Sequence, residues 1–305
     1  MGKRMVDKLV ADKHEIVVWN RSSGPLEELL EQYENLEPQS GVYGKLSVAA
    51  SVPDLVDRLR KPRVIWSMLP SGEVTKAILN RLSDLVDPGD IIIDGANSNY
   101  KDTEKRYEEF KERKIKFLGV GVSGGIISAT RGYPLMAGGN KSAYEYIKPI
   151  LKSLAKPYGG FEYFGEGGAG HFVKMIHNGI EYGIMQSLSE GFAVLQKAPY
   201  KFDLLKIANL YQKGTLVSGF MLDRAIEILE KNPDLGDVRG IIEESGEAGW
   251  TVEQAEEEEV DVASIKYALN YRRRSQTDRN IQKSYTAKLI ASLRNAFGGH
   301  EVKKK

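Results

Sequence analysis

The first half of the chain alternates between two hydrophobic patterns. Apolar residues spaced three and four apart predict amphipathic helices over 2–12, 26–33 and a stretch that ends at residue 86. Short β-branched, apolar runs predict buried strands at 15–19, 64–69, 91–94 and 116–120. The charged segment 101–114 predicts a solvated helix. Because strands alternate with helices, this half is predicted to be α/β, with a doubly wound parallel sheet.

The second half has a different pattern. After a glycine-rich loop at 157–168, helical periodicity dominates, over 170–197, 202–213, 220–231 and 264–297. The sequence therefore predicts two domains, an α/β domain over 1–160 and an all-α domain over 161–305.

The α/β domain begins in an unusual way. A Rossmann-type domain opens with a strand, a GxGxxG turn and a helix. Here the chain goes from Met1 directly into a helix, and only Gly2 could stand for the third glycine. The missing strand would be central, and each of its buried apolar side chains would contribute about 1.5–3 kcal/mol. Two explanations stay open: the start codon was assigned to an internal Met1, or the chain is a true truncation and a damaged enzyme.

The loop after the predicted strand at 15–19 holds the position that selects between dinucleotides in a Rossmann-type domain. An acidic residue there binds the ribose hydroxyls of NAD, whereas Arg21, flanked by Asn20 and Ser22, suits the 2′-phosphate of NADP. The alternative is a solvated loop arginine.

Three further polar or glycine-rich segments follow predicted strands. They are Met68-Leu69-Pro70-Ser71-Gly72, Asp94-Gly95-Ala96-Asn97-Ser98 and Ser123-Gly124-Gly125. Open α/β sheets bind ligands at the carboxyl ends of their strands, and Ser123 to Gly125 offer N–H groups and a hydroxyl to an anion. An ordinary glycine turn is the alternative for this last segment.

The most informative segment is the start of the long helix at 170–197. Its polar residues Lys174, His177, Asn178 and Glu181 lie at i, i+3, i+4 and i+7, and therefore on one helix face, among apolar neighbours. In a pocket, burial would lower the pKa of the lysine and raise that of the glutamic acid, as acid–base catalysis requires. A solvated helix face is the alternative.

Composition narrows the classes of function. The 305 residues carry 43 basic and 42 acidic side chains, a formal charge of +1, which argues against a general nucleic-acid or membrane-surface binder. Without cysteine there is no disulfide or thiolate nucleophile, and the four histidines are too scattered to predict a metal site. No membrane span or signal peptide is apparent, so a cytoplasmic protein is expected.

Taken together, these segments resemble the short, bacterial-type 6-phosphogluconate dehydrogenases. The resemblance runs over essentially the whole chain, through VVWNRS, MLPSG, DGANS, GVSGG, YPLMAGG, GAGHFVKMIHNGIEYG, SGEAGWT and RNAFGGH. It implies a Rossmann-type domain followed by a helical domain. It also implies oxidative decarboxylation of 6-phosphogluconate to ribulose 5-phosphate and CO2, with NADP, or NAD, as the cofactor and no metal.

The resemblance also implies residue roles. Lys174 matches the general base and Glu181 the acid that completes the reaction. The positions that match substrate contacts are Asn97, Ser123, Gly124, Gly125, His177, Asn178, Tyr182, Arg272, Arg294 and His300. The expected cofactor contacts are Gly2, Asn20, Arg21, Ser22, Met68, Leu69, Pro70 and Asn97. In the family the tail that carries Arg294 and His300 reaches a partner subunit, which implies a homodimer or homotetramer.

Two departures from the family leave alternatives open. The first strand is absent, and Ala248-Gly249 stands where relatives often have a basic residue. One alternative is a 3-hydroxyisobutyrate-type β-hydroxyacid dehydrogenase, against which Glu181 and the FGGH tail argue. The other is a catalytically impaired remnant that lacks the dinucleotide fingerprint.

Overall fold

The computed structural model describes residues 1–34 and 45–304. The chain divides into two compact units, Met1–Lys174 and Met175–Lys305, and the division falls inside helix α8, Ala169–Lys197. Each unit is described by itself.

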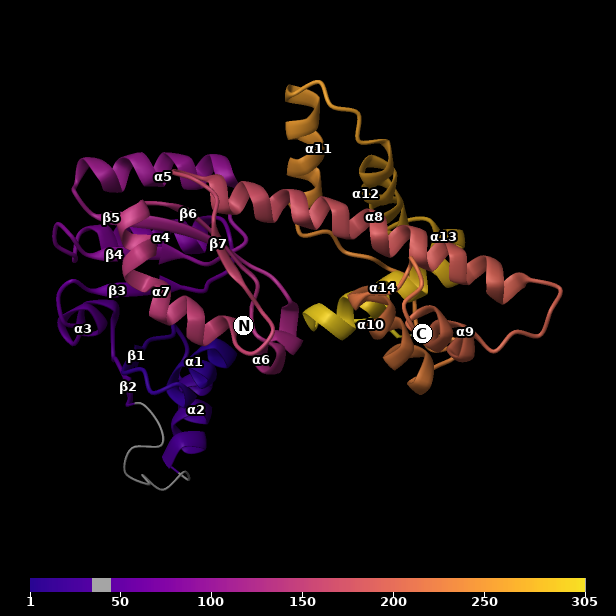
Figure 1. Cartoon of the computed structure of the whole chain (residues 1–305), viewed down its shortest axis with the longest axis horizontal. Helices are drawn as coiled ribbons and strands as arrows, with labels where there is room; N and C mark the ends of the chain where they lie inside the picture. Colours follow the sequence, from indigo (N-terminus) through magenta and orange to yellow (C-terminus); the bar gives the residue numbers. More distant parts are fainter. Residues whose placement is uncertain (35–44, 305) are drawn as a thin grey trace. The chain divides into compact units, whose positions relative to one another are not determined.

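The first unit alternates helices and strands (Figure 1). Its helices are α1 (Gly2–Ala11), α2 (Gly24–Glu34), α3 (Val52–Asp57), α4 (Glu73–Ser83), α5 (Tyr100–Glu112), η1 (Gly125–Ile127), α6 (Ser128–Arg131) and α7 (Lys141–Ala155). Its strands are β1 (Ile16–Val18), β2 (Leu46–Val48), β3 (Val64–Ser67), β4 (Ile91–Asp94), β5 (Lys116–Val122), β6 (Leu135–Gly139) and β7 (Phe161–Tyr163). The four strands expected from the apolar runs are therefore present as β1, β3, β4 and β5.

The larger sheet has the order β3-β4-β5-β6-β7. Its pairs are parallel, with Ile65 opposite Ile92 and Ile92 opposite Phe117, except that β5 and β6 are antiparallel. One pair therefore departs from the parallel arrangement predicted for the sheet. The reason is local: after β5 the chain reverses through η1 and α6, without the long crossover that a parallel return needs.

Strands β1 and β2 form a separate, parallel two-stranded sheet. In a Rossmann sheet the first strand lies between the second and the fourth. Strands β1, β2 and β3 correspond to the second, third and fourth strands of that fold. The two sheets are therefore separated, between β1 and β3, at the place that the first strand occupies in a Rossmann sheet.

Helices cover both faces of the larger sheet. Ile91 and Ile93 point into a cluster with α1 and α7, whereas Ile92, one residue out of phase, points into a cluster with α3, α4 and α5. Side chains alternate between the two faces of a strand, so β4 is apolar throughout because both of its faces are buried. The doubly wound α/β prediction is confirmed.

The second unit is helical. It contains the rest of α8 and α9 (Leu204–Tyr211), α10 (Phe220–Lys231), α11 (Glu247–Glu257), α12 (Ala263–Ser275), α13 (Arg279–Lys283) and α14 (Tyr285–Gly298). The predicted helical stretch over 264–297 is three helices, because Asp278 and Ser284 accept hydrogen bonds from backbone N–H groups and start new helices.

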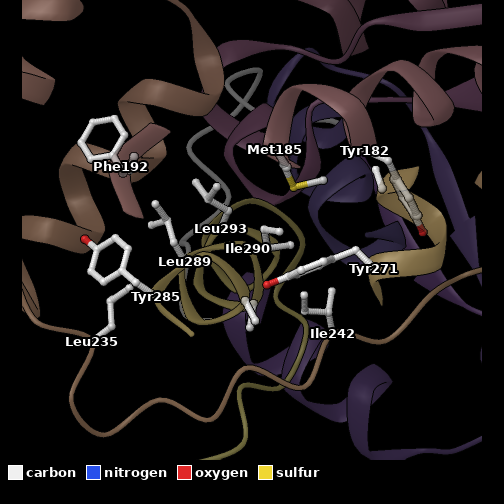
Figure 2. Close-up of a cluster of buried hydrophobic side chains, with 14 of the residues drawn as sticks. Tyr182, Met185, Phe192, Leu235, Ile242, Tyr271, Tyr285, Leu289, Ile290 and Leu293 are labelled. Atoms are coloured by element: carbon white, nitrogen blue, oxygen red, sulfur yellow. The ribbon is translucent and has the colours of Figure 1, made fainter. Parts of the chain in front are cut away.

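The core of this unit is formed around α14. Figure 2 shows Leu289, Ile290 and Leu293 of this helix facing Met185 of α8 and Tyr271 of α12. The pattern of buried positions on α8 and α14 explains why their apolar periodicity was visible in the sequence. In the described part of the chain, no helix combines the length and apolarity that crossing a bilayer requires.

Candidate active site

A buried carboxylate, that of Asp94, stabilises the loop after β4 by accepting hydrogen bonds from it. Asp94 is fully buried and accepts hydrogen bonds from the backbone N–H of Ala96 (3.0 Å) and the hydroxyl of Ser98 (2.7 Å). Arg106 of α5 donates to the same carboxylate through Nη1 at 3.1 Å. This network leaves Asn97 exposed at the carboxyl end of the strand, as a ligand contact requires.

The loop after β5 is shaped by two glycines in left-handed backbone conformations. Gly124 and Gly125 have φ angles of 88° and 59°, which non-glycine residues rarely adopt. The N–H of buried Ser123 donates to the Pro134 carbonyl at 2.9 Å. Since β3, β4 and β5 are parallel, Ser123 to Gly125 emerge at the same sheet edge as Asn97.

The β3 loop at this edge lies beside the start of α1. A side chain at Gly2 would contact Met68 Cβ at 3.4 Å. The Thr75 hydroxyl donates to the Pro70 carbonyl at 2.7 Å, which ties the loop Met68-Leu69-Pro70 to α4. The structure thus brings the Gly2 and Met68 segments together, although they are far apart in the sequence.

The segment expected to select the dinucleotide follows β1. The Asn20 side-chain amide donates to the carbonyl and the hydroxyl of Ser22, both at 3.0 Å, which closes a tight turn. Arg21 lies between them with its side chain exposed. An exposed guanidinium in a fixed turn is suited to a phosphate, although no contact of this side chain tests that role.

Lys174 belongs to the first unit and lies against β5. Its side chain is 7% exposed, and a methyl group on Gly121 would overlap its Cβ and lie 2.8 Å from its Cγ. The lysine stem therefore lies against bare backbone. An amine held on a buried stem is a suitable proton carrier, because its position is restricted before the substrate binds.

The next two turns of α8 carry the other polar side chains of the predicted face. Asn178 is buried, and its Oδ1 lies 3.0 Å from Nδ1 of His177. The same ring nitrogen lies 3.9 Å from the carboxylate of partly buried Glu181. A histidine, an amide and a carboxylate thus form one linked group on α8, as the i, i+3, i+4, i+7 spacing predicts.

A cluster of positive charge lies deeper in the helical unit. Arg272 is 2% exposed, and its guanidinium lies 3.1 Å from the ring centroid of Tyr182, whose hydroxyl has no hydrogen-bond partner among the described residues. Burial lowers the pKa of Arg272 to about 10. Burial also lowers the pKa of Arg294, and burial together with the charge of Arg294 lowers that of His300. Burial is the largest cause of each shift, and the carboxylates of Glu181 and Glu243 offset it only in part.

A cavity of about 380 Å³ opens beside this cluster. Its lining consists of Ile242, Glu243, Glu244, Arg272, Arg273 and Gln276. A phosphate at Arg272, Tyr182 and Arg294 would add negative charge beside the two guanidinium groups and could accept a hydrogen bond from the tyrosine hydroxyl. The expectation that Arg294 and His300 serve a partner subunit stays a prediction; in the single chain both act electrostatically on Arg272 or Tyr182 of the same chain.

Sequence reasoning missed several supporting residues. Arg106 lies on a helix expected to be solvated, yet it is buried with Thr103, Tyr107 and Phe110. Their i, i+3, i+4, i+7 spacing was the signal that one face of this charged helix is buried. His171, also buried, has its Nδ1 2.7 Å from the hydroxyl of Thr103. Among the described residues, no group of three or more potential ligands could hold a metal ion.

Comparisons with known proteins agree with this arrangement. Residues 1–167 match the sequence profile of the NAD binding domain of 6-phosphogluconate dehydrogenase, and residues 170–305 match that of the C-terminal domain of the same enzyme. A putative 6-phosphogluconate dehydrogenase of Bacillus subtilis is 35% identical over all of this chain and 95% of its own length. An NAD(+)-dependent, decarboxylating 6-phosphogluconate dehydrogenase of Haloferax volcanii is 34% identical, with 100% of this chain and 96% of its own length aligned.

Solved structures give the same result. The 6-phosphogluconate dehydrogenase of Plasmodium falciparum superposes with a TM-score of 0.81 at 30% identity, over 90% of this chain and 60% of its own. A 3-hydroxyisobutyrate dehydrogenase of Mycobacterium tuberculosis shares the fold, with a TM-score of 0.71, 17% identity and 96% of each chain covered. Two family profiles span nearly the whole sequence, and relatives of similar length align from end to end. The chain therefore belongs to the 6-phosphogluconate dehydrogenase family.

Proposed function

We propose that this chain catalyses the oxidative decarboxylation of 6-phosphogluconate to ribulose 5-phosphate and CO2, with reduction of NADP. One observation carries the proposal: α8 presents Lys174, His177, Asn178 and Glu181 at spacings that place them on one face, with the lysine stem buried. Family membership supports the oxidative decarboxylation, because a relative that aligns over 96% of its own length is named a decarboxylating 6-phosphogluconate dehydrogenase.

The proposed chemistry needs one proton acceptor and one proton donor. Bound NADP would supply the hydride acceptor for oxidation at C3 of the substrate, and Gly2, Met68 and the Asn20–Ser22 turn would hold it. Lys174, as a neutral amine, takes the proton of the 3-hydroxyl as that carbon is oxidised. The β-keto acid then loses its carboxylate as CO2, and the Lys174 ammonium donates its proton to the oxygen that becomes negative when the C–C bond breaks. Glu181, in its protonated form, then donates a proton to the carbon that lost CO2, while Lys174 takes back the proton of the enol hydroxyl, so that the carbonyl of the ketose forms.

Binding the substrate requires recognition of both its ends. We assign the phosphate to Arg272, Tyr182 and Arg294, with His300 beside them, because two buried guanidinium groups and a buried tyrosine hydroxyl lie in the helical unit, with a cavity lined by Arg272. We assign the hydroxyls and the carboxylate to Asn97, Ser123 to Gly125, His177 and Asn178, which supply amide, hydroxyl and N–H groups.

Two segments at the sheet edge are suited to binding the phosphate groups of a dinucleotide. Gly2 lies at the N-terminus of α1, where backbone N–H groups favour a phosphate, and Met68 lies beside it. Arg21, exposed in the Asn20–Ser22 turn, supports a preference for the 2′-phosphate of NADP. Relatives whose names specify NAD(+) make this preference a point for direct test.

We also propose that the enzyme is a homodimer or a larger symmetric assembly. Ile180, Ile184 and Val194 expose apolar side chains along α8, a pattern that a second copy would cover. Light scattering should then give at least twice the mass of one chain, whereas a monomer at micromolar concentration would contradict this proposal.

The activity is tested by reduction of NADP and of NAD, in parallel, by the purified chain with 6-phosphogluconate and with 3-hydroxyisobutyrate. We expect turnover with 6-phosphogluconate only, abolished in Lys174→Ala. In Arg21→Asp we expect KM for NADP to rise at least tenfold while KM for NAD stays within a few fold, since a charge-assisted contact to phosphate contributes about 1.5–3 kcal/mol. Turnover of 3-hydroxyisobutyrate alone would overturn the substrate assignment.

A further inference from the structure

One face of β5 has no side chains where helix α8 begins. Val120 and Val122 point into the core, while Gly119 and Gly121 alternate with them and point toward the first turns of α8. A methyl group on Gly119 would lie 2.6 Å from Thr103 Cγ2 and 3.0 Å from His171 Nδ1. Two residues along the strand, a methyl group on Gly121 would overlap Lys174 Cβ. One side chain of α8 therefore packs against each glycine: His171 against Gly119 and Lys174 against Gly121.

The backbone does not require glycine at these two positions. Neither Gly119 nor Gly121 has a positive φ angle, in contrast to Gly124 and Gly125. In a strand, glycine is less favourable than alanine by roughly 0.5–1 kcal/mol. What these glycines provide is space, and at Gly121 the space is filled by the lysine stem.

The start of α8 is fixed against the sheet by two further contacts. A methyl group on Gly170 would lie 2.5 Å from backbone atoms of Gly119, Met136 and Gly138, so the helix backbone rests directly on β5 and β6. One residue later, the fully enclosed ring of His171 is hydrogen-bonded to the Thr103 hydroxyl at 2.7 Å. Lys174 follows on the next turn, so these contacts fix the position of its backbone, from which the side chain extends.

We propose that Gly121, together with the His171–Thr103 hydrogen bond, positions the Lys174 amine for proton transfer. The inference rests on the proposed function, which gives Lys174 its proton-transfer role. A side chain at residue 121 would displace the lysine stem sideways, and a misplacement of about 1 Å can cost on the order of a hundredfold in rate. Gly121 itself touches no reacting atom, so it is a positioning residue and not a catalytic one.

The first test compares Gly121→Ala with Gly160→Ala. Gly160 lies in the same unit, and a methyl group there would meet nothing within 4 Å. In Gly121→Ala we expect kcat to fall at least about tenfold while KM for the dinucleotide stays within twofold. We also expect Gly121→Ala to melt at a lower temperature, because Lys174 Cβ must shift to admit the methyl group. Gly160→Ala should match the parent chain in all three measurements.

A second readout does not depend on turnover. Competitive labelling of lysines with acetic anhydride across a pH series, followed by mass spectrometry of the Lys174 peptide, reports the surroundings of this amine directly. We expect the labelling midpoint of Lys174 to shift in Gly121→Ala and to stay unchanged in Gly160→Ala. If the parent chain has no activity, the proposed function fails, yet this comparison still decides whether Gly121 positions the lysine.

The hydrogen bond to His171 is tested by the pair Thr103→Val and Thr103→Ser. Valine keeps the volume and removes the hydroxyl, whereas serine keeps the hydroxyl. We expect the Lys174 labelling midpoint to shift in Thr103→Val and to return in Thr103→Ser, and this pair decides the matter if Gly121→Ala does not fold. Unchanged labelling and kcat in Gly121→Ala, or equal effects of valine and serine, would overturn the inference.

Discussion

Buried histidines make the stability of this chain sensitive to acid. Burial lowers the pKa of His171, with Arg106 adding to the effect and Asp94 opposing it, and burial and Arg294 lower the pKa of His300. Both rings are therefore neutral in the folded chain at pH values where the unfolded chain binds a proton. Below the model-peptide pKa near 6.5, unfolding takes up protons, so stability is lost as pH falls.

We predict that the free energy of unfolding falls between pH 7 and pH 5, by up to about 1.4 kcal/mol per pH unit for each such histidine. Urea unfolding at several pH values measures this slope. In His171→Asn, which keeps a short polar side chain for Thr103, the slope should be smaller. An identical slope in the variant would mean that His171 does not stay neutral in the folded protein.

The spacing of residues along the sequence predicted the polar side chains that share one face of α8. It did not predict the residues of other elements that support the site. Lys174, His177, Asn178 and Glu181 could be predicted because helical periodicity alone places them on one face. Arg106 and Gly121 could not, because their contacts with Asp94 and Lys174 join elements that are distant in the sequence. The roles assigned to individual site residues stay predictions until they are mutated.

The packing of helix α8 requires glycine at position 170 but not at position 183. Gly170 rests on backbone atoms of β5 and β6 at distances that leave no room for a side chain. Gly183, thirteen residues later in the same helix, has nothing within 4 Å of the place a side chain would take. The same substitution should therefore have opposite effects at the two positions.

We predict that Gly170→Ala destabilises the protein by about 1–3 kcal/mol, because backbone atoms must shift to admit a methyl group. Gly183→Ala should instead stabilise it by roughly 0.5–1 kcal/mol, since alanine is the better helix former. Thermal and urea unfolding of both variants check the signs. Destabilisation by both, or by neither, would contradict the described packing of α8 on the sheet.

Strong local patterns predicted several elements of the fold. The helices at α8 and α10 and the strands β3 and β4 lie where periodicity or β-branched runs placed them. Strands β2, β6 and β7 have only three to five residues, and their pairing partners decide their state more than their own sequence does. The antiparallel pairing of β6 is a property of the connection before it, which no hydrophobic pattern records.

At the scale of the whole molecule, the open question is which chain supplies the tail residues of a given site. Family resemblance predicts that Arg294 and His300 serve a partner subunit. In the single chain, however, both affect the charge of buried groups around Arg272 and Tyr182 of the same chain. The two arrangements make opposite predictions for mixed assemblies.

Co-expression of Lys174→Ala with Arg294→Ala separates them. If Arg294 acts within its own chain, every site of a mixed assembly lacks one of the two residues and activity stays absent. Activity well above that of either variant alone would show that the tail acts across subunits. Equal expression of the two chains, verified by mass spectrometry, is the necessary control.

The central claim is that this chain oxidises and decarboxylates 6-phosphogluconate in one coupled reaction. The most direct measurement uses 6-phosphogluconate labelled with carbon-13 in its carboxylate and follows released labelled CO2 and reduced dinucleotide together. The account predicts equal amounts of the two products from the parent chain and neither from Lys174→Ala. Dinucleotide reduction without labelled CO2, or labelled CO2 at the same rate in Lys174→Ala, would contradict it.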